Sequence, residues 1–139
     1  VAISLTYRVL QDLETDYTAY VHLVDPQDAG PLLISQADAE PCGGALRTGT
    51  WRKGDTIRDT VQLAIPGDAA PGSYQLTTGF YTWPDIKPLE LSQGGAGVLG
   101  TLEIRLGLKK IVLLQSGNRS QFRNASASPK HSAGAFLGR

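Results

Sequence analysis

The amino-acid sequence predicts an all-β protein built as an antiparallel β-sandwich of seven to eight short strands. In several stretches of about ten residues, apolar side chains recur at every second position, which is the period of a strand with one buried face. Clusters of Pro, Gly and Asp separate these stretches, and no segment keeps a helical period over three turns. Each strand is therefore expected to bury one face between two sheets.

The stretch from Gly49 to Tyr81 reads as a central pair of strands joined by a Pro/Gly-rich loop. In the first strand, every second residue from Ile57 to Ile65 is apolar except Asp59. Asp59 is therefore expected on the same face as the apolar residues. A buried charge without a partner is costly. We therefore expect the Asp59 carboxylate to end the buried stripe, to meet a partner or to lie at the margin of a sheet.

The second strand of this pair, residues 73–82, indicates which kind of β-sandwich the sequence predicts. Its first residues, GSYQL from Gly72 to Leu76, look like the tyrosine corner of immunoglobulin-like sandwiches. In that corner a Tyr at the start of a strand donates a hydrogen bond to the backbone upstream, and Tyr74 holds the corresponding position. The predicted fold is thus an immunoglobulin-like sandwich.

The remaining strands follow from alternation and from β-branched or aromatic content. The most continuous apolar run, residues 17–24, is expected in the middle of a sheet, with residues 32–39 returning beside it. The other expected strands are residues 1–10, a short edge strand at 89–91, a closing strand at 98–106 and one more within 109–115.

Charge divides the chain into two parts. Residues 1–106 hold seven basic and 13 acidic side chains, whereas residues 107–139 hold six basic and no acidic ones. The sequence therefore predicts a β-sandwich domain over 1–106 and a basic, polar, poorly ordered tail over 107–139. The diluted tail charge does not predict nucleic-acid binding, and no apolar run approaches the roughly 20 residues of a membrane helix. Cys42 is the single cysteine, so no internal disulfide forms.

No group of residues in the sequence forms a catalytic or cofactor motif. A triad around His22 would need a Ser or Cys partner that the sequence does not identify, and His131 lies in the tail. Oxygen ligands for calcium could come from Asp25, Asp28 and Asp38, but the EF-hand spacing is absent. The sequence accordingly predicts no catalytic residue, no metal ligand and no cofactor.

Three aromatic residues are the candidate binding residues. Trp51, Tyr81 and Trp83 lie in or beside loops, where exposed rings can stack on the faces of sugars. The alternative is that they anchor the core, because Trp and Tyr bury large areas. For Trp51 the core interpretation is favoured, and for Trp83 the two interpretations are balanced.

A wider set of residues supports a family resemblance. In chain order they are the run Asp16–Asp25, Gln36–Asp38, Pro41–Gly44, Thr48, Thr50–Trp51, Lys53–Asp55, Asp59, Pro71–Leu76, Gly79–Tyr81 and Leu99–Gly100. With these residues, the stretch 1–106 resembles a bacterial β-sandwich domain found after the membrane-spanning part of glycosyltransferases similar to the protein O-mannosyltransferase class. The resemblance implies an extracytoplasmic accessory module without transferase residues, one or two strands before residue 1, and a tail foreign to the family.

Three functional hypotheses follow. The first is a non-catalytic, extracytoplasmic accessory or interaction domain of a membrane glycosyltransferase or envelope protein, with that membrane-anchored parent or a glycan as partner. The second is a carbohydrate-binding module that uses Trp51, Tyr81 and Trp83. A hydrolase built on His22 and nearby Asp residues is the least favoured. An open edge strand would also allow pairing between chains.

Overall fold

The computed structural model describes residues 1–27, 30–92, 96–105, 112–115 and 121–122. Over these residues it contains strands and two short 3-10 helices, which confirms the predicted all-β class. The strands are β1 (Ala2–Val9), β2 (Thr18–Asp25), β3 (Leu32–Ala39), β4 (Thr56–Gln62), β5 (Gly72–Tyr81), β6 (Gly97–Ile104), β7 (Val112–Gln115) and β8 (Gln121–Phe122); the helices are η1 (Pro41–Gly44) and η2 (Thr48–Thr50).

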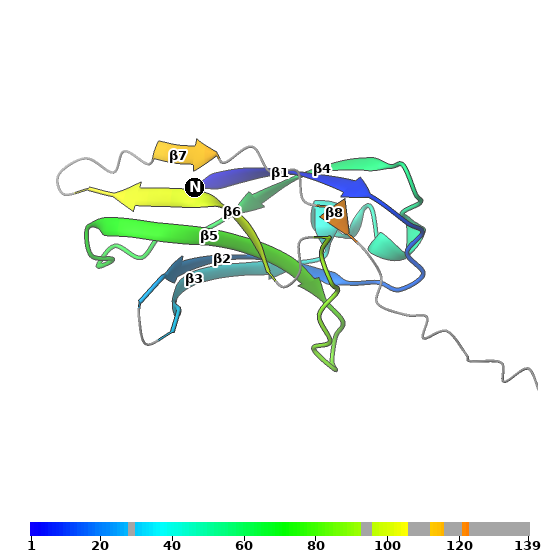
Figure 1. Cartoon of the computed structure of the whole chain (residues 1–139), viewed down its shortest axis with the longest axis horizontal. Helices are drawn as coiled ribbons and strands as arrows, with labels where there is room; N and C mark the ends of the chain where they lie inside the picture. The colour runs from blue at the N-terminus through cyan, green and yellow to red at the C-terminus, as the bar shows by residue number, and fades with distance from the viewer. Residues whose placement is uncertain (28–29, 93–95, 106–111, 116–120, 123–139) are drawn as a thin grey trace, which may run out of the picture.

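The strands form two layers. One sheet has the order β4-β1-β8 and the other has the order β3-β2-β5-β6-β7. All neighbours pair antiparallel except β1 and β8, which pair in parallel over two residues. Figure 1 shows β1 and β4 on one side of the long strand β5, and β2 and β3 on the other. The central position predicted for residues 17–24 is confirmed, because β2 lies between β3 and β5.

The core lies between the two sheets and consists of the alternate residues that the period-two pattern predicted. Strand β1 alternates exposed and buried positions along its whole length, with Ile3, Leu5, Tyr7 and Val9 buried. From the five-stranded sheet, the buried members are Val21, Leu23, Tyr74, Leu76, Phe80 and Leu102. Burial of these side chains is the main favourable term in folding a domain of this size.

The prediction of a central strand pair within residues 49–81 is wrong. Strand β4 pairs with β1 in the three-stranded sheet, while β5 lies between β2 and β6 in the other sheet. Alternation specifies which face of a strand is buried but not which strand it pairs with. The nine residues between them carry the chain from one sheet to the other, as connections in sandwiches do.

Residues 89–91 do not form the predicted edge strand. Leu89 and Leu91 are instead buried in the core, and an isolated bridge joins Tyr81 to Pro88 just before them. Two leucines that flank the exposed Glu90 can thus be buried without a regular strand. The predicted closing strand exists as β6, and residues 112–115 of the predicted 109–115 strand form β7 beside it.

Two local predictions are confirmed by hydrogen bonds. The Tyr74 hydroxyl donates to the carbonyl oxygen of Ala70 at 2.6 Å, four residues upstream, as the corner motif predicted. Asp59 lies at a sheet margin because β4 is an outer strand, and its Oδ1 accepts the backbone N–H of Thr60 at 2.7 Å. Asp59 pairs with the buried Leu5 of β1, so it occupies the inner face of an edge strand.

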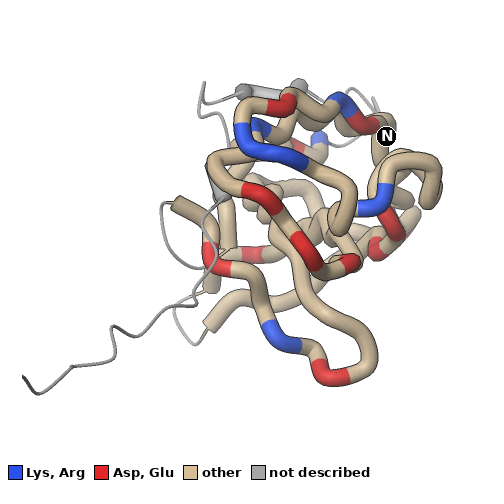
Figure 2. Tube along the Cα trace, turned by 90° about the vertical axis from the view of Figure 1, so that its right-hand side faces the viewer, with Lys and Arg blue, Asp and Glu red and all other residues tan. Residues whose placement is uncertain are grey.

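The division into residues 1–106 and 107–139 stays a prediction. Apart from β7 and β8, residues 106–139 lie outside the described part of the chain. Within that part, no helix has the length and the apolar character needed to cross a membrane. Figure 2 shows acidic and basic residues interspersed along the described chain rather than gathered into one basic surface.

Candidate functional site

The face of the five-stranded sheet that points away from the other sheet carries an unusual group of polar and aromatic side chains. Because Val21 and Leu23 of β2 point into the core, their neighbours Tyr20 and His22 lie on the opposite, outer face. The strand register places Asp38 of β3 directly opposite Tyr20. Tyr81 ends β5 on this same face. We call Tyr20, His22, Asp38 and Tyr81 the outer-face platform.

The three rings of the platform lie close together. The ring centroids of Tyr20 and His22 are 4.3 Å apart with an interplanar angle of 32°. Those of Tyr20 and Tyr81 are 6.3 Å apart with an angle of 33°. These separations fall near the range in which aromatic rings attract one another. The rings therefore form a continuous, partly exposed aromatic surface.

Gly79 on β5 explains why the Tyr20 ring lies flat on the sheet. It is directly opposite Tyr20 in the β2–β5 register. A Cβ atom built on Gly79 would approach Cζ of Tyr20 to 2.6 Å and Cε1 to 2.7 Å. Only a residue without a side chain leaves room for the ring at this place, and the ring in turn covers Gly79, which is buried.

Asp38 joins two members of the platform. Its Oδ2 accepts a 2.9 Å hydrogen bond from the Tyr81 hydroxyl, and its Oδ1 lies 3.4 Å from Nε2 of His22. Burial raises the pKa of Tyr20, and the Asp38 charge raises it further. Burial also raises the pKa of Tyr81, as do its hydrogen bond to Asp38 and the charge of Asp38. Both phenols therefore remain neutral donors at physiological pH.

His22 and Asp38 are close, but no hydrogen bond joins them. Nε2 of His22 is closed off from solvent and no hydrogen-bond partner satisfies it, although the carboxylate is within ion-pair distance. Thr77 pairs with His22 across β2 and β5, but no hydrogen bond joins the two side chains. Ser35 donates instead to the carbonyl of Ala64, and Cys42 donates to the carbonyl of Arg58. These contacts place no nucleophile against His22.

Trp51 is in the core and not at the surface. It is 1% exposed, its ring packs 5.6 Å from Tyr7 and 5.9 Å from Phe80, and its Nε1 donates to the carbonyl of Leu46 at 3.0 Å. Both ring and N–H are thus occupied, which leaves no face for a sugar. The core interpretation favoured for Trp51 is confirmed, and its use as a sugar-binding residue is wrong, because the ring lies between the sheets after η2.

Trp83 lies in the loop that follows Tyr81 and is 74% exposed. The backbone of this loop is closed by hydrogen bonds from Thr82 N to Lys87 O at 2.9 Å and from Ile86 N to Thr82 O at 2.7 Å. In Figure 1 the loop extends from the end of β5 away from β1 and β4. Tyr81 and Trp83 are therefore two residues apart, at one end of the outer face, whereas Trp51 is separate from both.

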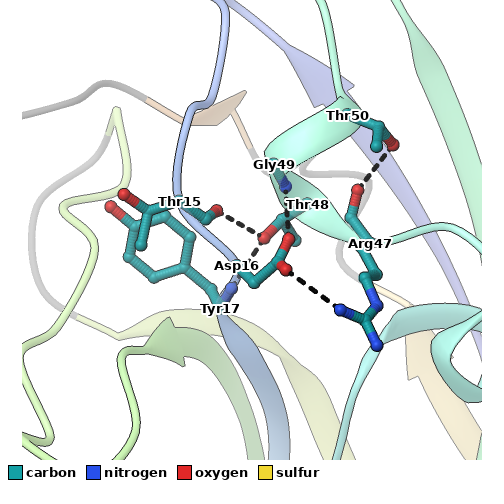
Figure 3. Close-up of polar contacts among 7 residues, drawn as sticks. All are labelled: Thr15, Asp16, Tyr17, Arg47, Thr48, Gly49 and Thr50. Carbon is teal, nitrogen blue, oxygen red and sulfur yellow. Dashed lines mark hydrogen bonds and ion pairs between the residues drawn. The ribbon is translucent and has the colours of Figure 1, made fainter.

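A second polar cluster lies between the β1–β2 connection and η2 (Figure 3). Thr48 is fully buried; its hydroxyl donates to Thr15 O at 2.9 Å and accepts the N–H of Tyr17 at 2.7 Å. Asp16 accepts the N–H of Gly49 at 3.0 Å and lies 3.6 Å from the Arg47 guanidinium. We call these residues the loop clamp. Their polar groups bind one another, so the cluster is structural.

The residues proposed as calcium ligands do not come together. The Asp25 carboxylate accepts a hydrogen bond from Gln27, Asp38 belongs to the platform, and Asp28 lies outside the described residues. Across the described ranges, no three His, Cys, Asp or Glu side chains are arranged to hold a metal ion. Alternation along β2 is enough to put Tyr20 and His22 on one face. It did not link them to Asp38 or Tyr81, since that link depends on strand register.

Comparison with known proteins leaves the function open. No family model matches the chain, and no solved structure matches it. The chain is similar to the "UPF0201 protein" of Pyrobaculum calidifontis, with 30% identity over 91 residues, which cover 59% of this chain and 64% of that protein. The chain thus spans less than two thirds of this relative. The relative's name states neither an activity nor a ligand.

Proposed function

We propose that this chain is a non-catalytic domain that binds neutral carbohydrate through the outer-face platform and the adjacent Trp83. The observation that carries the proposal is the row of His22, Tyr20 and Tyr81 rings around a single carboxylate. Aromatic rings present a broad apolar face with little side-chain entropy to lose on binding. Asp38 and the phenol hydroxyls supply acceptors and donors for sugar hydroxyl groups.

The charge of the surface indicates the class of carbohydrate. Strands β2, β3 and β5 contain no Lys or Arg, and Asp38 is the charged member of the platform. Recognition of a carboxylate, sulfate or phosphate relies mainly on Arg and Lys donors, of which these strands have none. An anionic sugar would also be repelled by Asp38. The platform therefore favours neutral glycans over uronic acids and phosphorylated sugars.

The accessory role rests on the sequence resemblance. We infer an immunoglobulin-like domain that follows the membrane-spanning part of a glycosyltransferase, on the extracytoplasmic side. Support comes from the Tyr74 corner bond and from the absence of a nucleophile against His22 in the contacts described above. Membrane helices encoded immediately upstream would support this placement, and an upstream coding sequence without them would remove it.

A glycan array followed by calorimetry tests the carbohydrate-binding function. The chain should bind one or more neutral glycans, and Tyr20→Ala and Trp83→Ala should each weaken binding by about tenfold, equivalent to about 1.4 kcal/mol. Ile86→Ala is a matched control, because Ile86 is an exposed apolar residue of the same loop as Trp83. An array without binding, or binding that neither aromatic substitution changes, would remove the proposal.

A further inference from the structure

Strand β3 has an open edge. It pairs with β2 along one side, and within the described residues no strand pairs along the other. An open edge presents unpaired N–H and C=O groups to any further strand. Pro and Lys, which normally discourage such pairing, do not occur in β3; its one charge is Asp38, and it has one bulge, at Ile34.

The outer strand of the other sheet shows how an edge is protected. On β4, Asp59 occupies the inner face, where its charge would be buried by an added strand. In addition, the Cys42 thiol at η1 donates to the carbonyl of Arg58 at 3.3 Å, which uses a backbone acceptor of β4. Among the described outer strands β3, β4, β7 and β8, the two long ones, β3 and β4, therefore differ, and β3 lacks the contact that occupies a backbone acceptor of β4.

We propose that β3 of one copy pairs antiparallel with β3 of a second copy, about a two-fold axis at Gln36. The register with β2 contains a bulge, since Leu23 pairs with Ser35 and Val24 pairs with Leu33. Ile34 is thus an extra residue in the strand. If Ile34 is also left unpaired between the two copies, Gln36 is the midpoint of the remaining residues of β3. The whole of β3 can then pair with β3 of the second copy.

The residues that oppose each other in this register are compatible. Gln36 faces Gln36, so that two amide side chains can bond across the axis. Leu33, which is 46% exposed, faces Asp38 of the other copy on the outer face. Asp38 is the one charged residue of β3, and this register keeps the two Asp38 carboxylates apart. The paired strands then join two five-stranded sheets into one.

The consequence for binding rests on the proposed function. Both outer-face platforms would lie on the same face of the joined sheet. The two β2 strands would be separated by three strand spacings, which is about 14 Å. One glycan chain could then contact both platforms, and binding of the second platform would become intramolecular.

A cysteine cross-link tests the register. Gln36→Cys, made together with Cys42→Ser, places two thiols on the axis, where opposed Cα atoms are about 5 Å apart and can form a disulfide. Asp38→Cys with Cys42→Ser is the control, because its two Cα atoms would be about 14 Å apart. After mild oxidation, the first variant should run as a covalent dimer and the control as a monomer. Equal cross-linking of both variants, or of neither, would overturn the proposal.

Analytical ultracentrifugation tests the interface by charge. The intact chain should show a concentration-dependent dimer, and Leu33→Asp should weaken it about tenfold, because a second carboxylate then faces Asp38 twice in each dimer. Leu33→Lys should retain the dimer, since opposite charges then meet. A wild-type chain that stays monomeric, or two variants that behave alike, would contradict the proposal. Neither experiment contains a glycan, so a failure here leaves the carbohydrate-binding proposal standing.

Discussion

The Tyr81 hydroxyl donates a 2.9 Å hydrogen bond to Asp38, although β2 lies between the strands that carry these two residues. The Tyr81 side chain therefore extends across the outer face of β2, beside the Tyr20 ring. This bond connects β5 to the outer strand β3 through side chains alone. Because the same carboxylate lies 3.4 Å from Nε2 of His22, Asp38 is in contact with side chains from both β2 and β5.

The Gly79→Ala substitution should displace the Tyr20 ring. A Cβ atom at position 79 comes within 2.7 Å of ring carbons, a separation at which the ring has to move. We expect glycan binding to fall at least tenfold while the fold is retained. Isothermal titration calorimetry measures glycan binding, and far-ultraviolet circular dichroism checks that the fold is retained.

Gly72→Ala is the matched control in the same strand, since a Cβ atom there lies 3.7 Å from the nearest Tyr74 atom, an ordinary contact. It should bind like the wild type. In a Tyr20→Ala background, Gly79→Ala should have no further effect, because the ring that it displaces is gone. Additive losses in the double variant would show that Gly79 acts by another route.

The Tyr74→Phe substitution should lower stability by about 1 kcal/mol, the usual net value of one hydrogen bond. It removes the bond to Ala70 O and keeps the buried ring. Urea unfolding monitored by fluorescence measures the loss. Tyr20→Phe serves as the comparison, and we expect it to change the unfolding midpoint less. An unchanged midpoint for Tyr74→Phe would argue against a stabilising corner.

The Thr48→Val substitution should be among the most damaging polar-to-apolar changes in the chain. It keeps the shape of the side chain but removes the fully buried hydroxyl that bonds Tyr17 N–H and Thr15 C=O inside the loop clamp. Each of these two hydrogen bonds contributes about 0.5–1.5 kcal/mol. A total loss of about 1–3 kcal/mol is expected in the free energy of unfolding, read from urea titrations.

Thr50→Val is the control for this substitution within the same turn. The Thr50 hydroxyl donates to Arg47 O at 2.7 Å, but Thr50 is exposed, so water replaces the lost bond. Its effect should stay below about 1 kcal/mol. Equal losses for the two threonines would mean that burial of the clamp does not determine its contribution.

Stability should fall at alkaline pH. Burial raises the pKa of Tyr7, Tyr20 and Tyr81, so the folded chain keeps these protons after the unfolded chain has released them near pH 10. The contribution is complete below about pH 9 and is lost as the pH rises above about 10. Urea midpoints between pH 8 and 11 should show this decrease. Tyr7→Phe should reduce its slope, whereas an increase in midpoint with pH would contradict the assignment.

The sequence was sufficient for β1 to β6, because a period of two appears directly in the residue pattern, but the run at 89–91 was too short to show such a period. The sequence could not specify strand partners: β4 and β5 are neighbours in sequence yet belong to different sheets. The size of Trp51 favoured a place in the core, but its neighbours Tyr7 and Phe80 are distant in sequence and could not be named from it. The outer-face platform could not be predicted either, because the contacts among Asp38, Tyr20 and Tyr81 depend on which strands pair and in which register.

The most direct test of the central claim is a titration of isotope-labelled protein with a neutral glycan, followed by amide chemical shifts. Binding at the outer face should shift the signals of Tyr20, His22, Asp38, Gly79 and Tyr81 first. Signals of β1 and β4, in the other sheet, should remain in place. Shifts confined to β1 and β4, or no shifts with any neutral glycan at millimolar concentration, would contradict the account.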